Sequence, residues 1–135
     1  MSDRPPELIK PSQGKNLTGL VDGHGWRILT DRHSSKMVMG LIYVDPGKSP
    51  HRWHNHDSQD SKDGYTVHYP EGFEEAYVVV QGRGLLQWKE NGEIKEQRFE
   101  TGDCIYCPPG VVEHQLLNDQ EVPMTVVYAG TPPMV

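Results

Sequence analysis

Three of the chain's seven histidines lie within six residues, in the segment HRWHNH at positions 51–56. If this segment is a β-strand, His54 and His56 point to the same face, because side chains alternate along a strand. Two imidazoles side by side favour a bound divalent metal. Further along the chain, Glu75 and His114 offer the carboxylate and the third imidazole that would complete a ligand set. The sequence therefore predicts a metal site.

The carboxylate of this set has two adjacent candidates in a predicted strand over residues 74–80. Glu75 shares its face of the strand with Tyr77 and Val79, so its carboxylate would enter an otherwise apolar interior. Such a group is costly to bury unless a metal with imidazole partners compensates it. Glu74 is the alternative ligand, although it would face the opposite side of the strand.

Three further residues are candidates for a supporting or chemical role. His51 lies on the face opposite the paired histidines, as an alternative ligand or as a solvent-facing residue. Tyr65 and His68 fall in a polar insertion over residues 57–73. A loop of this kind over a barrel mouth can act as a lid, and these two residues could supply an acid or a base. The competing interpretation is a solvated loop without contact to the site.

Cys104 and Cys107 form a C-x-x-C pattern, which raises redox or zinc chemistry. Redox motifs of this form lie at a helix N-terminus, where the thiolate is stabilised. Here the surrounding sequence is typical of a short strand that enters a turn, and residues three apart on a strand face opposite sides. We therefore interpret both cysteines as buried structural thiols.

Composition limits the class of protein. A chain of 135 residues fits a single domain, and 14 Gly with 11 Pro favour short strands and many turns. Thirteen basic against 19 acidic residues give a formal charge of −6, without the basic stripe expected of a nucleic-acid-binding protein. No long apolar run and no charged-then-apolar leader are visible, so we expect a soluble cytoplasmic protein that does not enter a membrane.

The elements that must position these residues are all predicted to be strands. Residues 1–15 are expected to form an N-terminal arm, and residues 16–135 a single domain. Asn91-Gly92 is typical of a two-residue hairpin turn. Short strands at regular spacing indicate an all-β barrel or sandwich. The predicted strands cover residues 26–30, 37–44, the segment with His54 and His56, 65–69, 74–80, 85–90, 93–99, 104–107, 114–117 and 124–129.

With these motifs the sequence resembles the cupin family, whose two motifs are G-x5-H-x-H-x3/4-E-x6-G and G-x5-P-x-G-x2-H-x3-N. The first motif is matched by Gly47, His54, His56, Glu75 and Gly82. The second is matched by Gly102, Pro108, Gly110, His114 and Asn118. The order of the motifs and the hairpin between them also fit the family.

Three spacings depart from the family pattern. Six residues rather than five separate Gly47 from His54, and three rather than two separate Gly110 from His114. The stretch between His56 and Glu75 is far longer than the usual three or four residues. The E-x6-G spacing nevertheless favours Glu75 over its neighbour as the carboxylate.

The resemblance implies a double-stranded β-helix, or jelly-roll barrel, with one divalent transition metal per chain (Fe, Mn, Ni, Co, Zn or Cu) held by His54, His56, Glu75 and His114. It also implies a homodimer. We expect a metal-dependent enzyme that acts on an oxygen-rich small molecule, by dioxygenase or by lyase, isomerase or cyclase chemistry. The alternative is a non-catalytic cupin module that binds a sugar or an organic acid.

Overall fold

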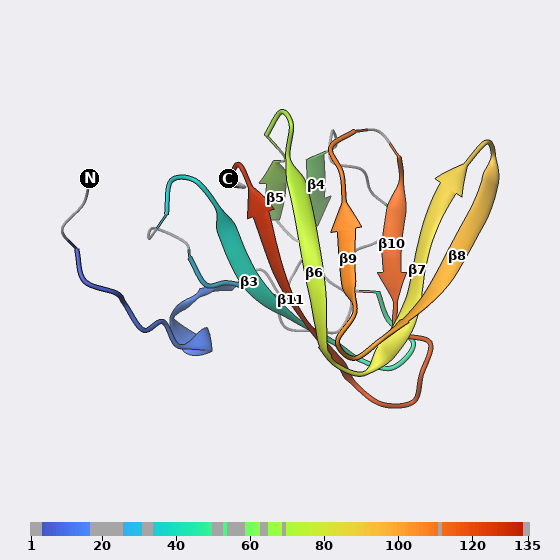
Figure 1. Ribbon diagram of the computed structural model, residues 1–135, viewed down its shortest axis with the longest axis horizontal. Coiled ribbons are helices and arrows are strands. Elements are labelled where there is room, and N and C mark those ends of the chain that lie inside the picture. Colours follow the sequence, from blue (N-terminus) through green and yellow to red (C-terminus); the bar gives the residue numbers. More distant parts are fainter. Residues whose placement is uncertain are drawn as a thin grey trace.

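The chain forms strands almost throughout (Figure 1). The computed structural model describes residues 4–16, 26–30, 34–49, 53, 59–62, 65–68, 70–110 and 112–133. Its elements are η1 (Pro11–Gln13), β1 (Lys15–Asn16), β2 (Trp26–Ile28), β3 (Val38–Val44), β4 (Gln59–Lys62), β5 (Tyr65–His68), β6 (Glu74–Gln81), β7 (Arg83–Glu90), β8 (Glu93–Glu100), β9 (Cys104–Cys107), β10 (His114–Leu117) and β11 (Met124–Thr131).

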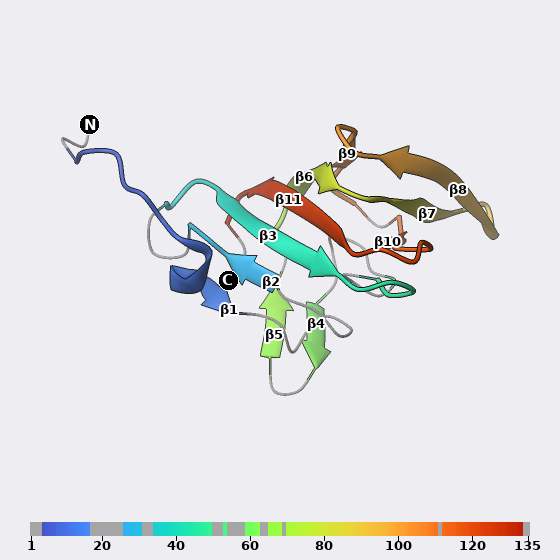
Figure 2. The same ribbon diagram turned by 90° about the horizontal axis from the view of Figure 1, so that it is seen from below.

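The strands form two antiparallel sheets and a separate two-stranded ribbon. The larger sheet has the order β1-β2-β3-β11-β6-β9, and the smaller has the order β10-β7-β8. The ribbon pairs β4 with β5, and Figure 2 shows it on the same side of the large sheet as β10. The expectation of an all-β fold is therefore confirmed.

The core lies on one face of the large sheet because apolar side chains alternate along its central strands. β3 and β11 show strict alternation of buried and less buried positions, and β6 does so as far as Val79. Val44, Met124 and Val126 are fully buried from these strands. Burial of one face per strand lets a short chain with few apolar residues build a core.

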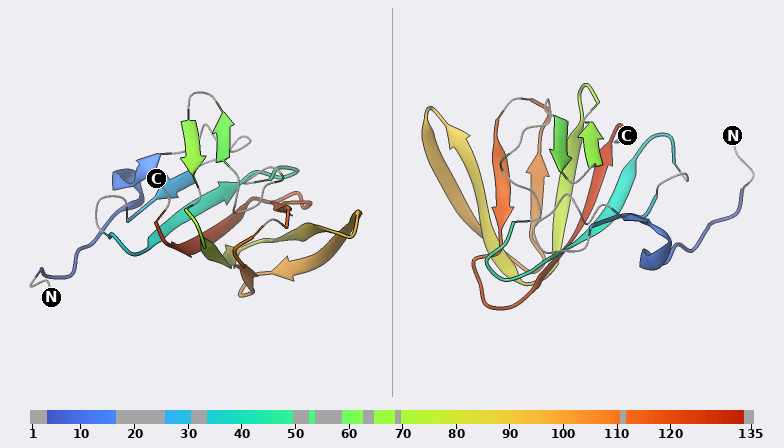
Figure 3. Two further views of the ribbon diagram at one scale, coloured as in Figure 1. Left: turned by 90° about the horizontal axis from the view of Figure 1, so that it is seen from above. Right: turned by 180° about the vertical axis from the view of Figure 1, so that it is seen from behind.

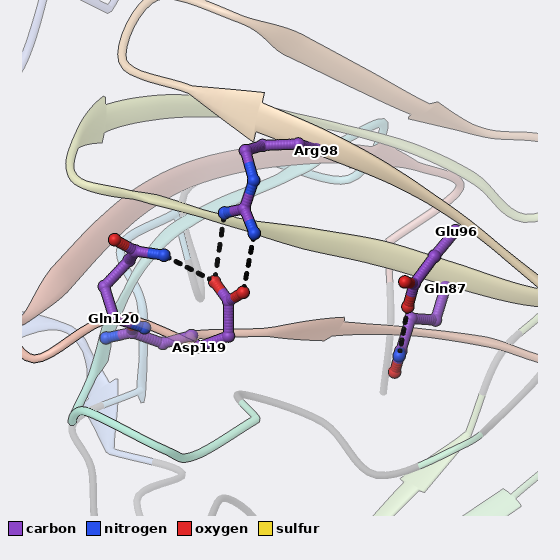
Figure 4. A network of polar contacts seen from close by, with 6 residues as sticks. Gln87, Glu96, Arg98, Asp119 and Gln120 are labelled. Carbon is purple, nitrogen blue, oxygen red and sulfur yellow. Dashed lines mark hydrogen bonds and ion pairs between the residues drawn. The ribbon is translucent and has the colours of Figure 1, made fainter.

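The small sheet carries much more charge. The β7–β8 hairpin turns at Asn91 and Gly92, with φ of 51° and 78°, as the two-residue turn prediction requires. β8 has the sequence EIKEQRFE and is exposed at every position except Phe99. Charged side chains on a long edge strand oppose pairing with another chain. Figure 4 shows polar contacts that link this strand to its neighbours, including the pair between Arg98 and Asp119.

The two sequence motifs meet in the fold through Asn118. Its side-chain amide is fully buried and donates hydrogen bonds to the carbonyls of Val44, at 3.1 Å, and Val122, at 2.9 Å. The amide N–H of Gly47 donates to the Asn118 carbonyl at 2.7 Å. The first glycine of one motif is thus tied to the last residue of the other. Gly82, which ends the first motif, has a backbone φ of +100°, and residues that carry a side chain rarely adopt this conformation.

Several strand predictions need correction. The structure starts β7 at Arg83 rather than at residue 85, so Gly84 belongs to the strand. The insertion contains the β4–β5 ribbon rather than a single short strand. Phe73, at its end, is fully buried in the core, so residues 57–73 are not all a solvated excursion. The predicted strand with His54 and His56 lies outside the described residues.

The N-terminal residues 4–10 run away from the sheets without regular structure, as Figure 1 shows. They lead into η1 and then into β1, which pairs with β2. Among the described residues, η1 is the only helix, and a single turn of three residues is far too short to cross a membrane.

Candidate metal centre

Glu75 lies inside the fold on β6, between β11 and the edge strand β9 of the large sheet. Its side chain is 5% exposed, and the next inward positions, Tyr77 and Val79, are 3% and 1% exposed. Burial raises the pKa of its carboxyl to about 7, although a hydrogen bond from Tyr77 acts in the opposite direction. Glu74 is exposed. The predicted orientation of the two glutamates is confirmed, while the role of Glu75 as a ligand stays a prediction.

His114 begins β10 and faces the interior, with 8% of its surface exposed. Its Nδ1 lies 3.1 Å from the carbonyl of Val112. Because a carbonyl only accepts, Nδ1 must carry the proton, and Nε2 then keeps the lone pair that a metal would take. Nε2 is buried. Burial lowers the pKa of the ring, against the effect of the Val112 hydrogen bond, and so favours the neutral form that ligates metals.

Cys107 connects the surroundings of these two residues. It stands opposite Glu75 in the register of β6 with β9, and it lines a cavity together with His114. Burial raises the pKa of its thiol to about 12, and the nearby Glu75 and Cys104 add to the effect. The thiol is therefore neutral and apolar in character at ordinary pH.

The two cysteines face opposite sides of β9, as strand alternation predicts. Cys107 is buried, but Cys104 is exposed, and both are free thiols. The expectation that both are buried is wrong for Cys104. The reason is that only one face of β9 packs against the core, so the alternation that buries Cys107 leaves Cys104 exposed.

A cavity of about 280 Å³ opens beside His114 between the two sheets. β7 forms one wall, and β9 with the turn that follows it forms another. Most of the wall is apolar or aromatic. Sequence reasoning missed these wall residues because nothing in a tryptophan or a proline pair marks it as cavity lining. The described lining residues are Leu86, Trp88, Tyr106, Cys107, Pro108, Pro109, Val112 and His114.

His54, His56 and His51 lie outside the described residues. Within the described part of the chain, no three His, Cys, Asp or Glu side chains come together as a metal site. The two described members of the predicted set, Glu75 and His114, both point into the interior. A buried carboxylate and a neutral imidazole whose Nε2 faces inward fit a divalent transition metal.

The structure places Tyr65 and His68 at the two ends of β5. The ribbon stands off the large sheet, in front of β6 when the molecule is seen from behind (Figure 3, right). Their side chains are outside the description, so their chemical role stays a prediction.

A cupin-domain family, Cupin_2, matches residues 61–130, more than half of the 135 residues. The chain belongs to this family. The matched region includes Glu75, Gly82 and the whole second motif, but it starts after His54 and His56. No curated protein gives a significant match.

Many solved structures share the fold. A sugar phosphate isomerase of the cupin superfamily from Silicibacter pomeroyi is 20% identical with a TM-score of 0.69, over 94% of this chain and 76% of that chain. A predicted oxalate decarboxylase from Thermotoga maritima is 17% identical with a TM-score of 0.66, over 94% and 100%. A polyketide cyclase from Streptomyces resistomycificus is 16% identical with a TM-score of 0.65, over 96% and 84%. At these identities the likeness establishes the cupin fold.

Proposed function

We propose that this cupin is a metal-dependent enzyme that holds one divalent transition metal with His54, His56, Glu75 and His114. The observation that carries the proposal is the burial of Glu75 on β6 of the large sheet and of His114 on β10 of the small sheet. A carboxyl group with a pKa raised to about 7 by burial is an unfavourable component of an apolar core. A bound cation would offset this cost by stabilising the ionised form.

When bound, the metal supplies Lewis-acid polarisation of a substrate oxygen or, if it is redox-active, oxygen chemistry. The chain's own residues prepare the site for this. The Val112 carbonyl fixes the tautomer of His114, and the Tyr77 hydroxyl supports the Glu75 carboxylate. The buried thiol of Cys107 keeps the nearby wall neutral.

The cavity wall suggests the form of the substrate. Leu86 and Trp88 on one side and Pro108 and Pro109 on another present apolar surface beside the imidazole of His114. A ligand that fits this wall has an apolar body with oxygen donors at one end, so that the donors reach the metal. We therefore propose a compact organic molecule with a carbonyl, enol or phenol oxygen as the substrate class.

Tyr65 and His68 are proposed to act on such a substrate from the β4–β5 ribbon. The ribbon lies on the same side of the large sheet as β10, which carries His114 (Figure 2). In this role the phenol of Tyr65 and the imidazole of His68 would donate a proton to, or accept one from, the substrate.

Metal analysis of the purified protein, paired with a screen for substrate-dependent oxygen uptake, tests this proposal. A bound transition metal with oxygen uptake would select a dioxygenase. A bound metal without uptake would favour lyase, isomerase or cyclase chemistry. Protein that takes up no metal after incubation with Fe²⁺, Mn²⁺, Co²⁺ and Zn²⁺ would overturn the proposal in favour of the non-catalytic binding module.

We also propose that the protein is a homodimer. The outer face of the large sheet exposes Val78, Val80 and Tyr106, at 42%, 47% and 57%, and the extended arm exposes Leu8 at 85%. A second copy would cover such apolar surface, and the arm could reach across to it. A sedimentation mass near 15.3 kDa, that of one chain, at micromolar concentration would contradict the dimer.

A further inference from the structure

The chain that leads into the histidine segment is attached to the strand of His114. The carbonyl of Lys48 accepts a hydrogen bond from the N–H of Asn118 at 2.8 Å. The hydroxyl of Ser49 donates to the carbonyl of Leu116, two residues from His114 on β10. Lys48 and Ser49, which precede the histidine segment, are therefore fixed beside β10.

A second attachment lies within the histidine segment itself, at Trp53. The ammonium group of Lys89 is 4.9 Å from the centroid of the Trp53 ring. The same ammonium group forms an ion pair with Glu113 at 2.7 Å, and the N–H of Lys89 donates to the Glu113 carbonyl at 3.0 Å. Trp53 directly precedes His54, and Glu113 directly precedes His114. One lysine thus joins the immediate neighbours of two predicted ligands.

We infer that Trp53, Lys89 and Glu113 form a bracket that positions His54 and His56 against His114. The inference rests on the proposed metal site. Consecutive Cα atoms are about 3.8 Å apart, so fixing the Trp53 ring restricts where the next imidazole can lie. Ligands held in place before the metal arrives bind it more tightly than ligands that must be ordered on binding. The bracket residues are positioning residues and do not touch the metal.

A second lysine of similar exposure offers a matched control. Lys95 forms an ion pair with Glu93 at 3.0 Å, and its side chain is 46% exposed, against 47% for Lys89. Both residues of this control pair lie on β8, whereas β10 pairs with β7. Loss of Lys95 removes the same charge without touching the bracket.

The experiment is a Co²⁺ titration of the purified, metal-free 135-residue chain. Binding is monitored by the visible absorption bands of the bound ion and by competition with a chelator. The variants are Lys89→Met, Trp53→Leu and Trp53→Phe, with Lys95→Met as the control and His114→Ala as the test of the site. Thermal unfolding of each metal-free variant records its stability separately.

Lys89→Met and Trp53→Leu should weaken Co²⁺ binding about fivefold, the size expected for one cation–π contact, and should alter the absorption bands. Trp53→Phe should retain most of the affinity because an aromatic face remains, and Lys95→Met should match the wild type. If Lys89→Met and Trp53→Leu bind like Lys95→Met while His114→Ala loses Co²⁺, the bracket is contradicted and the metal site stands. If His114→Ala binds Co²⁺ normally, both proposals fail.

Discussion

Two carboxylates, one in the core and one at the edge of the small sheet, have pKa values shifted in opposite directions. Glu75 on β6 is buried, and burial raises the pKa of its carboxyl to about 7. Asp119 follows β10 at the edge of the small sheet and forms a two-point pair with Arg98, with oxygen–nitrogen distances of 3.1 and 2.7 Å (Figure 4). Hydrogen bonds from Arg98 and Gln120 lower its pKa to about 2.

The difference identifies which acidic group is prepared for chemistry. The charge of Asp119 is compensated by Arg98 within the protein, so this carboxylate needs no bound cation. Glu75 is held in an apolar environment where its charge is stabilised poorly, which is the condition under which a metal or a proton is recruited. Changes at Glu75 are therefore expected to have larger effects than changes at Asp119.

The largest effect is the pH dependence that Glu75 gives to the metal-free protein. Its carboxyl pKa is 4.5 as a free group and about 7 in the fold, so the folded chain binds the proton more tightly. The resulting stabilisation is fully present below about pH 4.5 and is lost as the pH rises through 7, with a total of about 3 kcal/mol. Urea unfolding between pH 4.5 and 8, in the presence of a chelator, measures it.

The Glu75→Gln variant is the control for this pH dependence, because its side chain has a similar shape and does not titrate. The comparison uses the slope of the unfolding free energy with pH rather than its absolute value. An equal slope in the variant and the wild type would show that Glu75 is not the group responsible.

The next effect is the loss of the buried amide of Asn118. Asn118→Ala removes the hydrogen bonds donated to Val44 and Val122 and leaves two carbonyls without them. We expect the free energy of unfolding to fall by about 2 kcal/mol. Asp119→Ala, one residue away at the rim, should cost much less. An equal loss of unfolding free energy in the two variants would show that the buried amide of Asn118 contributes no more than the exposed side chain of Asp119.

A smaller effect is expected from removal of the β4–β5 ribbon. Gln59 and His68 are opposite each other in the ribbon, so a short Gly-Ser linker can replace residues 59–68 and leave Phe73 in the core. Metal content and folding should persist, while turnover falls by at least about tenfold, or about 1.4 kcal/mol. Steady-state kinetics test this once a substrate is known, and unchanged values would remove Tyr65 and His68 as candidates.

The smallest effect concerns the rim pair. Without its partner in an Arg98→Ala variant, the Asp119 carboxyl should titrate closer to its ordinary pKa of 3.8 instead of about 2. In the wild type, the stabilisation from this pair is therefore present above about pH 3.8 and is lost as the pH falls toward 2. An NMR titration of the carboxyl carbon measures both values, and identical midpoints would show that Arg98 does not set the pKa.

The fold was largely predictable because its signals are local. Alternation along β6 predicts that Glu75 points into the core and Glu74 points outward, and Asn91-Gly92 predicts the hairpin turn. The burial of Phe73 was not predictable, because a polar segment around it masks an anchor whose contacts are far away in sequence. The exposure of one cysteine follows from alternation along β9, but which of the two faces the core depends on packing that the local sequence does not show.

The candidate site was predictable only where its signals are local in the sequence. Residue type and spacing identify ligands such as His114, but the cavity wall beside it is a product of three-dimensional packing. The same holds for Lys89, whose contact with Trp53 joins segments far apart in the chain. An ordinary surface lysine and a bracket lysine look alike in sequence.

Mass spectrometry of the metal content tests the proposed metal site directly, in the wild type and in the variants His54→Ala, His114→Ala and Gln115→Ala. Gln115 adjoins His114 on β10 but hydrogen-bonds to Gln87 at 2.8 Å, away from the proposed site, so it is a matched control. We predict one metal ion per chain in the wild type and in Gln115→Ala, and loss of most of the metal in both histidine variants with the β fold retained. Full metal occupancy in His54→Ala and His114→Ala would contradict the proposed ligand set.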